Sequence, residues 1–262
     1  MSKSEPRKTK AKGLDRAFAI LDHLCQVGEP QRPIDIADGM GAPKSTVYDL
    51  VALLVSTNVL EKVDKQGRVF LGPKLNFWST NYNRHFDLSG IAQPILESIT
   101  EETRETSQLC TLDGDKYYVA MINEGNRPFR ISANVGERTP IPWTASGRLL
   151  LSHLSDEQIL DLIPETDFDL PDGSRLEPTD FIASIRAASK AAFFDFDSVA
   201  DTFTHCFAAP VIGADGICKH TLCIIAPKDD AIENYQTYRK VLVDAAAKLS
   251  RRLANDSSVA AE

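Results

Sequence analysis

The chain has 262 residues, of which 43% are hydrophobic and 25% charged, and its formal net charge is −8. This composition is that of a soluble globular protein with room for two modest cores, and no apolar run approaches the roughly 20 residues that cross a bilayer. The basic start of the chain lacks the apolar stretch of a secretory signal, so we expect a cytoplasmic protein without a membrane partner.

The charge is divided unevenly along the chain. Residues 1–72 hold eleven Lys and Arg against nine Asp and Glu, a net +2, whereas the remaining residues hold eighteen against twenty-eight, a net −10. An acidic surface repels phosphate, so any DNA contact is expected within the first 72 residues. Residues 1–12 are polar and lysine-rich, which predicts a disordered basic tail.

Three short helices are expected near the start of the chain. Apolar residues spaced by three and four predict helices over residues 14–25, 33–40 and 44–57. Gly41 suits a left-handed cap after the second helix, and Ser45 is expected to cap the start of the third. Two helices joined across such a tight turn are typical of a helix-turn-helix.

A hairpin is expected directly after the third helix. Two β-rich runs, residues 59–63 and 68–72, flank the turn sequence DKQG. A hairpin in this position is the wing of a winged helix-turn-helix, whose recognition helix enters the major groove by its N-terminal turns. We therefore expect DNA contacts from Lys44, Ser45, Thr46, Tyr48, Asp49, Lys62, Lys65 and Arg68. A winged helix that binds protein instead of DNA remains the alternative.

The rest of the chain predicts a second domain of a different kind. Residues 73–105 are expected to form linker and dimerisation helices, and residues 255–262 a disordered tail. Between them, strands are expected at 107–112, 117–122, 129–133, 193–196, 207–212 and 221–225, and helices at 144–154, 156–162, 179–192 and 233–253. This order predicts an α+β domain with a mostly antiparallel sheet flanked by helices.

The sequence contains few features of a metal site or of an enzyme active site. Alternation along a strand is expected to place Cys218 and His220 on one face and Cys223 on the other, and the spacing matches no zinc pattern. The chain contains no GxSxG, no phosphate-binding glycine loop and no HExxH. We therefore expect a protein that is not an enzyme and holds no metal or cofactor.

Several segments carry a family resemblance. APKSTVYDLVALLVSTNVLEK followed by GRVFLGPKL resembles the IclR family of bacterial transcriptional regulators, and VGERTPIPWTASGRLLL, THCFAAPVIGADG and KHTLCIIAP are similar to its effector domain. The resemblance implies a winged helix-turn-helix over 13–72, a helical linker over 73–105 and a GAF-like effector-binding domain over 106–254. It also implies a homodimer or homotetramer that binds a palindromic double-stranded operator. Members of the family repress or activate catabolic operons, and here a repressor that a small metabolite releases or alters is expected. A scaffold regulator without an effector is the other hypothesis.

The resemblance also implies where the effector binds. Carried over by position, the pocket comprises Ile131, Trp143, Ala145, Ser146, Gly147, Asp197, Cys206, Cys223 and Ile225. A helix N-terminus beside the Ser146 hydroxyl favours a carboxylate, so a small organic acid or its semialdehyde is expected.

The chain departs from the family pattern at three places. Tyr48-Asp49 stands where many members carry His-Arg, Pro142-Trp143 where a histidine is common, and Cys223 and Ile225 where two serines are common. The acidic Asp49 predicts an atypical operator, because a carboxylate repels phosphate but can accept from a cytosine amino group. The less polar pocket wall favours an effector with an apolar or aromatic portion.

Overall fold

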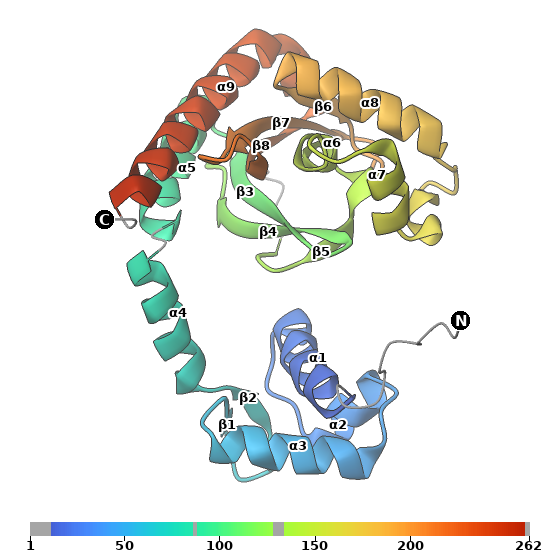
Figure 1. The fold of residues 1–262 in the computed structure, drawn as a ribbon, viewed down its shortest axis with the longest axis vertical. Coiled ribbons are helices and arrows are strands. Elements are labelled where there is room, and N and C mark those ends of the chain that lie inside the picture. Colours follow the sequence, from blue (N-terminus) through green and yellow to red (C-terminus); the bar gives the residue numbers. More distant parts are fainter. Residues whose placement is uncertain (1–11, 86–87, 128–133, 260–262) are drawn as a thin grey trace, which may run out of the picture. The chain divides into compact units, whose positions relative to one another are not determined.

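A computed structural model describes residues 12–85, 88–127 and 134–259 (Figure 1). The chain divides into two compact units, one ending at His85 and the other beginning at Phe86. Within the described ranges, no helix combines the length and the apolar character needed to cross a membrane.

The first unit contains three helices, a two-stranded hairpin and a fourth helix. These elements are α1 (Lys12–Val27), α2 (Pro33–Gly39), α3 (Lys44–Ser56), β1 (Leu60–Lys62), β2 (Val69–Leu71) and α4 (Pro73–His85). Its core gathers the apolar faces of α1, α2 and α3 around Ile20, Leu24, Ile36, Val47 and Val51. The apolar residues whose spacing predicted the three helices therefore pack together in one core.

The turns of this unit follow the sequence with one exception. Gly41 has φ +60° and Gly67, in the turn between β1 and β2, has φ +79°, conformations that favour glycine. The antiparallel register pairs Leu60 with Leu71. The helix α3 begins at Lys44 as predicted, but the expected cap by Ser45 is wrong, because Pro43 occupies the N-cap position and Ser45 lies inside the first turn.

The second unit is built on a six-stranded antiparallel sheet. Its strands, in the order β5-β4-β3-β8-β7-β6, are β3 (Thr106–Asp113), β4 (Lys116–Asn123), β5 (Arg138–Pro140), β6 (Phe194–Asp197), β7 (Thr204–Ile212) and β8 (Cys218–Pro227). Its helices are α5 (Leu88–Thr103), α6 (Ala145–Leu150), α7 (Asp156–Leu162), α8 (Pro178–Ala191) and α9 (Lys228–Val259), with short 3₁₀ turns at Ile141–Trp143 and Glu165–Phe168.

The sheet separates two cores. On one face, α5 and α9 pack against inward residues such as Leu109, Phe207 and Leu222. On the other face, α6, α7 and α8 pack against residues that include Cys110, Ala208 and Cys223. The alternation of side chains along β7 and β8 supplies both cores from the same strands.

Several predicted boundaries differ from the structure. Helix α6 ends at Leu150 rather than residue 154, β5 was not expected, and α9 runs to Val259, past the expected start of a tail at 255. Helix α5, expected as part of a linker over 73–105, contributes Ala92, Ile95, Leu96 and Ile99 to the core of the second unit. The strand expected at 129–133 lies outside the described residues.

The predicted faces of β8 are also corrected. Cys218 lies in the same core as Cys223, not on the opposite face. The cause is a register shift, because Val211 pairs with His220 whereas Ile212 pairs with Cys218, leaving one extra residue in β8. Such a bulge reverses the alternation of side chains on either side of it.

Candidate DNA-binding surface and ligand pocket

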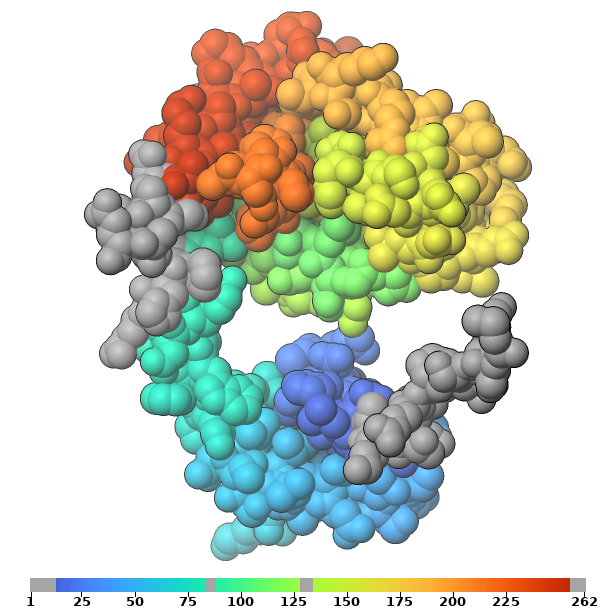
Figure 2. Space-filling view, viewed as in Figure 1, coloured from blue at the N-terminus to red at the C-terminus, as the bar shows by residue number. Residues whose placement is uncertain are grey.

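Helix α3 presents one apolar and one polar face. Val47 and Val51 are buried, whereas Tyr48 is 50% exposed and Asp49 is also exposed. Lys44 and Ser45 are exposed as well, and Thr46 is half-buried. Side chains of this region form the light-blue surface in the space-filling view (Figure 2). The N-terminal turns of α3 therefore have the free polar face that a recognition helix needs.

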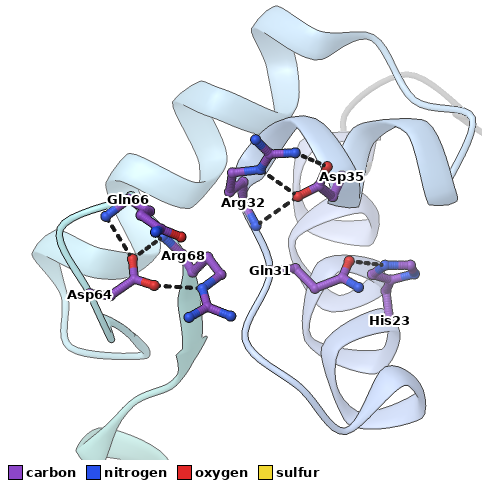
Figure 3. A network of polar contacts seen from close by, with 7 residues as sticks. All are labelled: His23, Gln31, Arg32, Asp35, Asp64, Gln66 and Arg68. Carbon is purple, nitrogen blue, oxygen red and sulfur yellow. Dashed lines mark hydrogen bonds and ion pairs between the residues drawn. The ribbon is translucent and has the colours of Figure 1, made fainter.

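Two of the expected DNA-contacting cations are paired with carboxylates. Lys44 Nζ lies 3.3 Å from Asp38 Oδ1, and Arg68 Nε lies 2.5 Å from Asp64 Oδ2. Asp64 also accepts from the backbone N–H groups of Gln66 and Arg68, which fixes the turn of the wing (Figure 3). These contacts lower the pKa of Asp64, through the Arg68 hydrogen bond first. Phosphate must therefore compete with a carboxylate for Lys44 and Arg68.

The remaining wing lysines are more accessible. Lys62, on β1, and Lys65, in the turn, are both exposed. Two further polar contacts, to the right of the wing residues in Figure 3, join Arg32 to Asp35 and His23 to Gln31. The Arg32–Asp35 contact closes the first turn of α2, and Lys62 and Lys65 are exposed point charges.

A cavity of about 250 Å³ lies in the second unit, where the 3₁₀ turn and the start of α6 meet the sheet. Its wall includes Tyr117 and Val119 from β4 and Phe207 from β7. Six of the nine residues expected to form the effector pocket line it, namely Trp143, Ala145, Ser146, Cys206, Cys223 and Ile225. The volume is slightly below the usual range of about 300–1,000 Å³ for small-molecule pockets, so a ligand here must be small.

The other three residues expected in the effector pocket are not among those that line the cavity. Ile131 lies outside the described residues. Gly147 is buried behind the wall, where a β-carbon would collide with the carbonyl oxygen of Ile141. Asp197 is exposed and does not line the cavity; its carboxylate accepts from His205 Nδ1 at 2.8 Å and from Lys228 Nζ at 3.0 Å, contacts that lower its pKa.

The start of α6 is already capped within the protein. Thr144 Oγ1 accepts from the Gly147 backbone N–H at 3.0 Å. Trp143, expected in the pocket, is half-buried and lines the cavity, and its Nε1 donates to the Asp167 carbonyl at 2.9 Å. The expected carboxylate site at this helix N-terminus therefore has at least one of its N–H groups occupied.

A hydrogen-bonded chain joins β8 to α6 at the cavity wall. Thr221 Oγ1 donates to Ser146 Oγ at 2.7 Å, and Ser146 Oγ lies 2.8 Å from Cys223 Sγ. Cys110 Sγ donates to Cys223 Sγ at 3.8 Å. Burial raises the pKa of the Cys110 thiol, whereas the donors around Cys223, Cys110 first, lower the pKa of that thiol.

Gln108 is one of the pocket residues that the sequence did not indicate, and it is the one with an unpartnered polar atom. It lies on β3, is 1% exposed and lines the cavity, and its Nε2 is buried without a hydrogen-bond partner in the described part of the chain. Its Oε1 is 3.5 Å from the Tyr117 hydroxyl. The signal in the sequence was an amide inside the apolar strand around Leu109, since a buried amide with a free donor costs free energy unless something accepts from it.

Arg148 was also missed, and it secures one wall of the cavity. The side chain is 5% exposed and its Nη1 donates to the carbonyl oxygens of Pro142 at 2.7 Å and Thr144 at 2.6 Å. Its guanidinium stacks on three rings, with the Cζ atom 4.9, 5.2 and 5.0 Å from the centroids of Phe181, Phe194 and Phe196. Burial lowers its pKa to about 9. Arg148 thus ties the 3₁₀ turn to α6 through the turn's own carbonyls.

Titratable side chains do not assemble a metal site in the described ranges, where no group of three His, Cys, Asp or Glu could hold an ion. His205 and Cys206 point to opposite faces of β7: the His205 ring packs 4.8 Å from Phe207 in one core, while Cys206 packs against the other. The arrangement offers a binding cavity rather than a nucleophile–base pair.

Comparison with known proteins finds family matches for both units of the chain. The model of the IclR helix-turn-helix domain matches residues 13–64, and that of the bacterial transcriptional regulator IclR C-terminal region matches residues 80–251. The chain is similar to the HTH-type transcriptional regulator TtgV of Pseudomonas putida, with 30% identity over 162 residues, 61% of this chain and 62% of TtgV. The chain is also similar to the acetate operon repressor of Salmonella typhimurium and to the transcriptional repressor IclR of Escherichia coli. The alignments to these two proteins and to TtgV span about three fifths of each relative's length.

Two solved structures share the fold. A putative IclR regulator from Silicibacter sp. TM1040 superposes with a TM-score of 0.80 at 19% identity, covering 92% of this chain and 96% of that chain. An IclR homologue from Microbacterium hydrocarbonoxydans, complexed with 4-hydroxybenzoate, superposes with a TM-score of 0.77 at 22% identity, covering 93% and 99%. With both family models matched in order along the sequence, the chain belongs to the IclR family of bacterial transcriptional regulators.

Proposed function

We propose that the protein represses a catabolic operon by binding a palindromic double-stranded operator, and that a small organic acid, semialdehyde or aromatic metabolite releases it. In this proposal, residues 13–72 bind DNA, residues 73–105 link and dimerise, and residues 106–254 form a GAF-like sensor. The working species is a homodimer or homotetramer, because a palindrome requires two recognition helices related by two-fold symmetry.

The surface of the first unit supports the DNA-binding half of the proposal. The exposed turns of α3 offer Lys44, Ser45 and Tyr48 to the major groove, with Thr46 and Asp49 beside them. The wing offers Lys62, Lys65 and Arg68 to the backbone. The carboxylates of Asp38 and Asp64 hold two of these cations in place until phosphate replaces them.

The observation that carries the sensing half is the cavity with an unpartnered amide in its wall. Gln108 Nε2 requires an acceptor, which a carboxylate, carbonyl or hydroxyl oxygen of a ligand would supply. The surrounding apolar wall of Val119, Trp143 and Ile225 suits a small apolar or aromatic body. The homologue that binds 4-hydroxybenzoate lends support to an aromatic acid.

The proposed switch is a shift between two arrangements of the oligomer. A ligand that binds one arrangement more tightly shifts the population toward it, by no more than its difference in affinity for the two. The cavity lies between the sheet and the turn that Arg148 secures, so a ligand that displaces this turn would couple to α6.

An electrophoretic shift assay tests this proposal. The full chain is incubated with the DNA upstream of its own gene, with and without a panel of aliphatic and aromatic acids and aldehydes. Specific binding that one compound relieves supports both halves. Binding that no compound alters contradicts the sensing half, and a folded dimer that binds no promoter DNA favours the protein-interaction alternative.

A further inference from the structure

Cys223 occupies an unusual position for a buried thiol, because its sulfur is surrounded by donors. Ser146 Oγ lies 2.8 Å from Cys223 Sγ, and since Thr221 Oγ1 donates to Ser146 Oγ, the Ser146 hydroxyl proton is directed to the sulfur. Cys110 Sγ donates to the same sulfur at 3.8 Å. Hydrogen bonds to a sulfur favour its thiolate form, which is the nucleophilic form of cysteine.

Gln108 lies opposite Cys223 on the neighbouring strand. The two residues are direct partners in the register between β3 and β8, so their side chains project from the same face of the sheet. Both line the cavity, and Gln108 brings the donor that lacks a partner. A nucleophilic sulfur and a free amide N–H at one cavity wall are the two groups that addition to a carbonyl requires.

We propose that Cys223 captures an aldehyde in this cavity as a reversible hemithioacetal, with Gln108 holding the carbonyl oxygen. The inference rests on the proposed sensing function and identifies its ligand as an aldehyde with a small apolar or aromatic body. A bond forms between Cys223 Sγ and the carbonyl carbon, and the π-electron pair of the carbonyl becomes a lone pair on oxygen. That oxygen takes the proton that the thiol loses, so the thiol adds across the double bond without an oxidant or reductant.

The other nearby thiols are poorer candidates. Cys110 does not line the cavity and acts as a donor to Cys223. Cys206 lines the cavity, but burial raises the pKa of its thiol to about 12. The donors around Cys223 lower its pKa instead, with Cys110 first. The chemistry therefore favours Cys223 over both neighbours.

The test follows the carbonyl carbon of benzaldehyde labelled with carbon-13. The full chain is used as a Cys25→Ser variant, because Cys25 is exposed and could react without selectivity. We expect the labelled signal to move from the carbonyl region to the region of sp³ carbons bonded to oxygen and sulfur. The signal should be lost in Cys223→Ser and kept in Cys206→Ser. In Gln108→Leu the adduct should weaken by roughly two- to tenfold, as expected for one lost hydrogen bond.

An unshifted carbonyl signal would overturn the proposal, and so would an adduct that persists in Cys223→Ser. Cooperative unfolding checks that this variant is folded, and Cys223→Ala provides a second test of the same position. Because this measurement contains no DNA, it is separate from the proposed regulatory function. An adduct without DNA release contradicts the regulatory function alone, whereas DNA release by benzaldehyde in Cys223→Ser contradicts covalent capture alone.

Discussion

Ser146 Oγ, at the start of α6, lies 2.8 Å from Cys223 Sγ in the middle of β8. Both residues line the cavity, and both are at least 95% buried. The contact joins the helix that bounds the pocket to the strand that runs between β3 and β7. A change at the pocket therefore reaches the centre of the sheet through one side-chain contact.

Replacing Ser146 with Ala tests this contact. The variant removes the hydroxyl that the geometry directs to Cys223 Sγ and leaves Thr221 Oγ1 without its acceptor. We expect the free energy of unfolding to fall by about 1 kcal/mol, the usual net value of one buried hydrogen bond. The pKa of Cys223 should rise, so that alkylation by iodoacetamide at a fixed pH slows. Unchanged stability and alkylation would show that the contact contributes nothing.

Replacing Arg148 with Met tests the support of the pocket wall. Two hydrogen bonds to the turn carbonyls and three ring contacts are lost, while the cost of burying a charge is relieved. We expect a net loss of about 2 kcal/mol in unfolding free energy, measured by urea denaturation. Arg186→Met is the matched control, because Arg186 also donates to two carbonyls but is more exposed. An equal loss in both variants would contradict a special role for Arg148.

The helices could be predicted because their apolar periodicity is local. Residues 44–57 show one apolar face in the sequence, and the structure buries Val47 and Val51 from that face. Strand β5 was missed because it has three residues, ends in Pro140 and lies at the edge of the sheet, where the pattern is too short to detect. The length of α6 was overestimated because Leu150 and Leu151 are both fully buried, so burial continued past the end of the helix.

The candidate site could be predicted in part, because several of its residues lie in segments that resemble the family pattern. The family pattern located the turn around Trp143 and the strands that carry Cys206 and Cys223, and these residues line one cavity. It did not reveal Gln108, whose importance depends on a long-range pairing between β3 and β8. Nor could it reveal the bulge in β8, because a register shift depends on the partner strand.

The wing can be tested through salt. Lys65 lies exposed in the turn between β1 and β2. In Lys65→Ala we expect DNA affinity to fall, and the plot of log affinity against log salt to become shallower by about 0.9, because one phosphate contact is lost. Lys240→Ala, at an exposed position of α9, is the control of equal charge and should leave the slope unchanged. Equal slopes in the wild type and Lys65→Ala would place the wing turn away from DNA.

His205 predicts a pH dependence of stability in the second unit. Hydrogen bonds to Asp195 at 3.0 Å and Asp197 at 2.8 Å raise the pKa of His205 above its ordinary value of 6.5, with Asp195 the larger cause. Because the pKa is raised on folding, protonated His205 contributes its full stabilisation below pH 6.5. This contribution is lost as the pH rises through the pKa of His205 in the folded protein. The difference in melting temperature between the wild type and His205→Asn should therefore be largest below pH 6.5 and shrink as the pH rises through the raised pKa of His205. A difference that widens with pH would contradict the assignment.

In the proposed function a ligand in this cavity controls DNA binding, so the operator affinity should depend on the ligand. Fluorescence anisotropy gives the operator Kd of the wild type and of Cys206→Leu, whose larger side chain fills part of the cavity. Each Kd is measured with and without the compound that relieves DNA binding in the electrophoretic shift assay. We predict that the compound changes the wild-type Kd by roughly 5- to 150-fold, the usual range of coupling between sites, and that Cys206→Leu binds DNA normally without responding. If the compound changed the operator Kd of both proteins equally, it would act from another site, and control of DNA binding through this cavity would be contradicted.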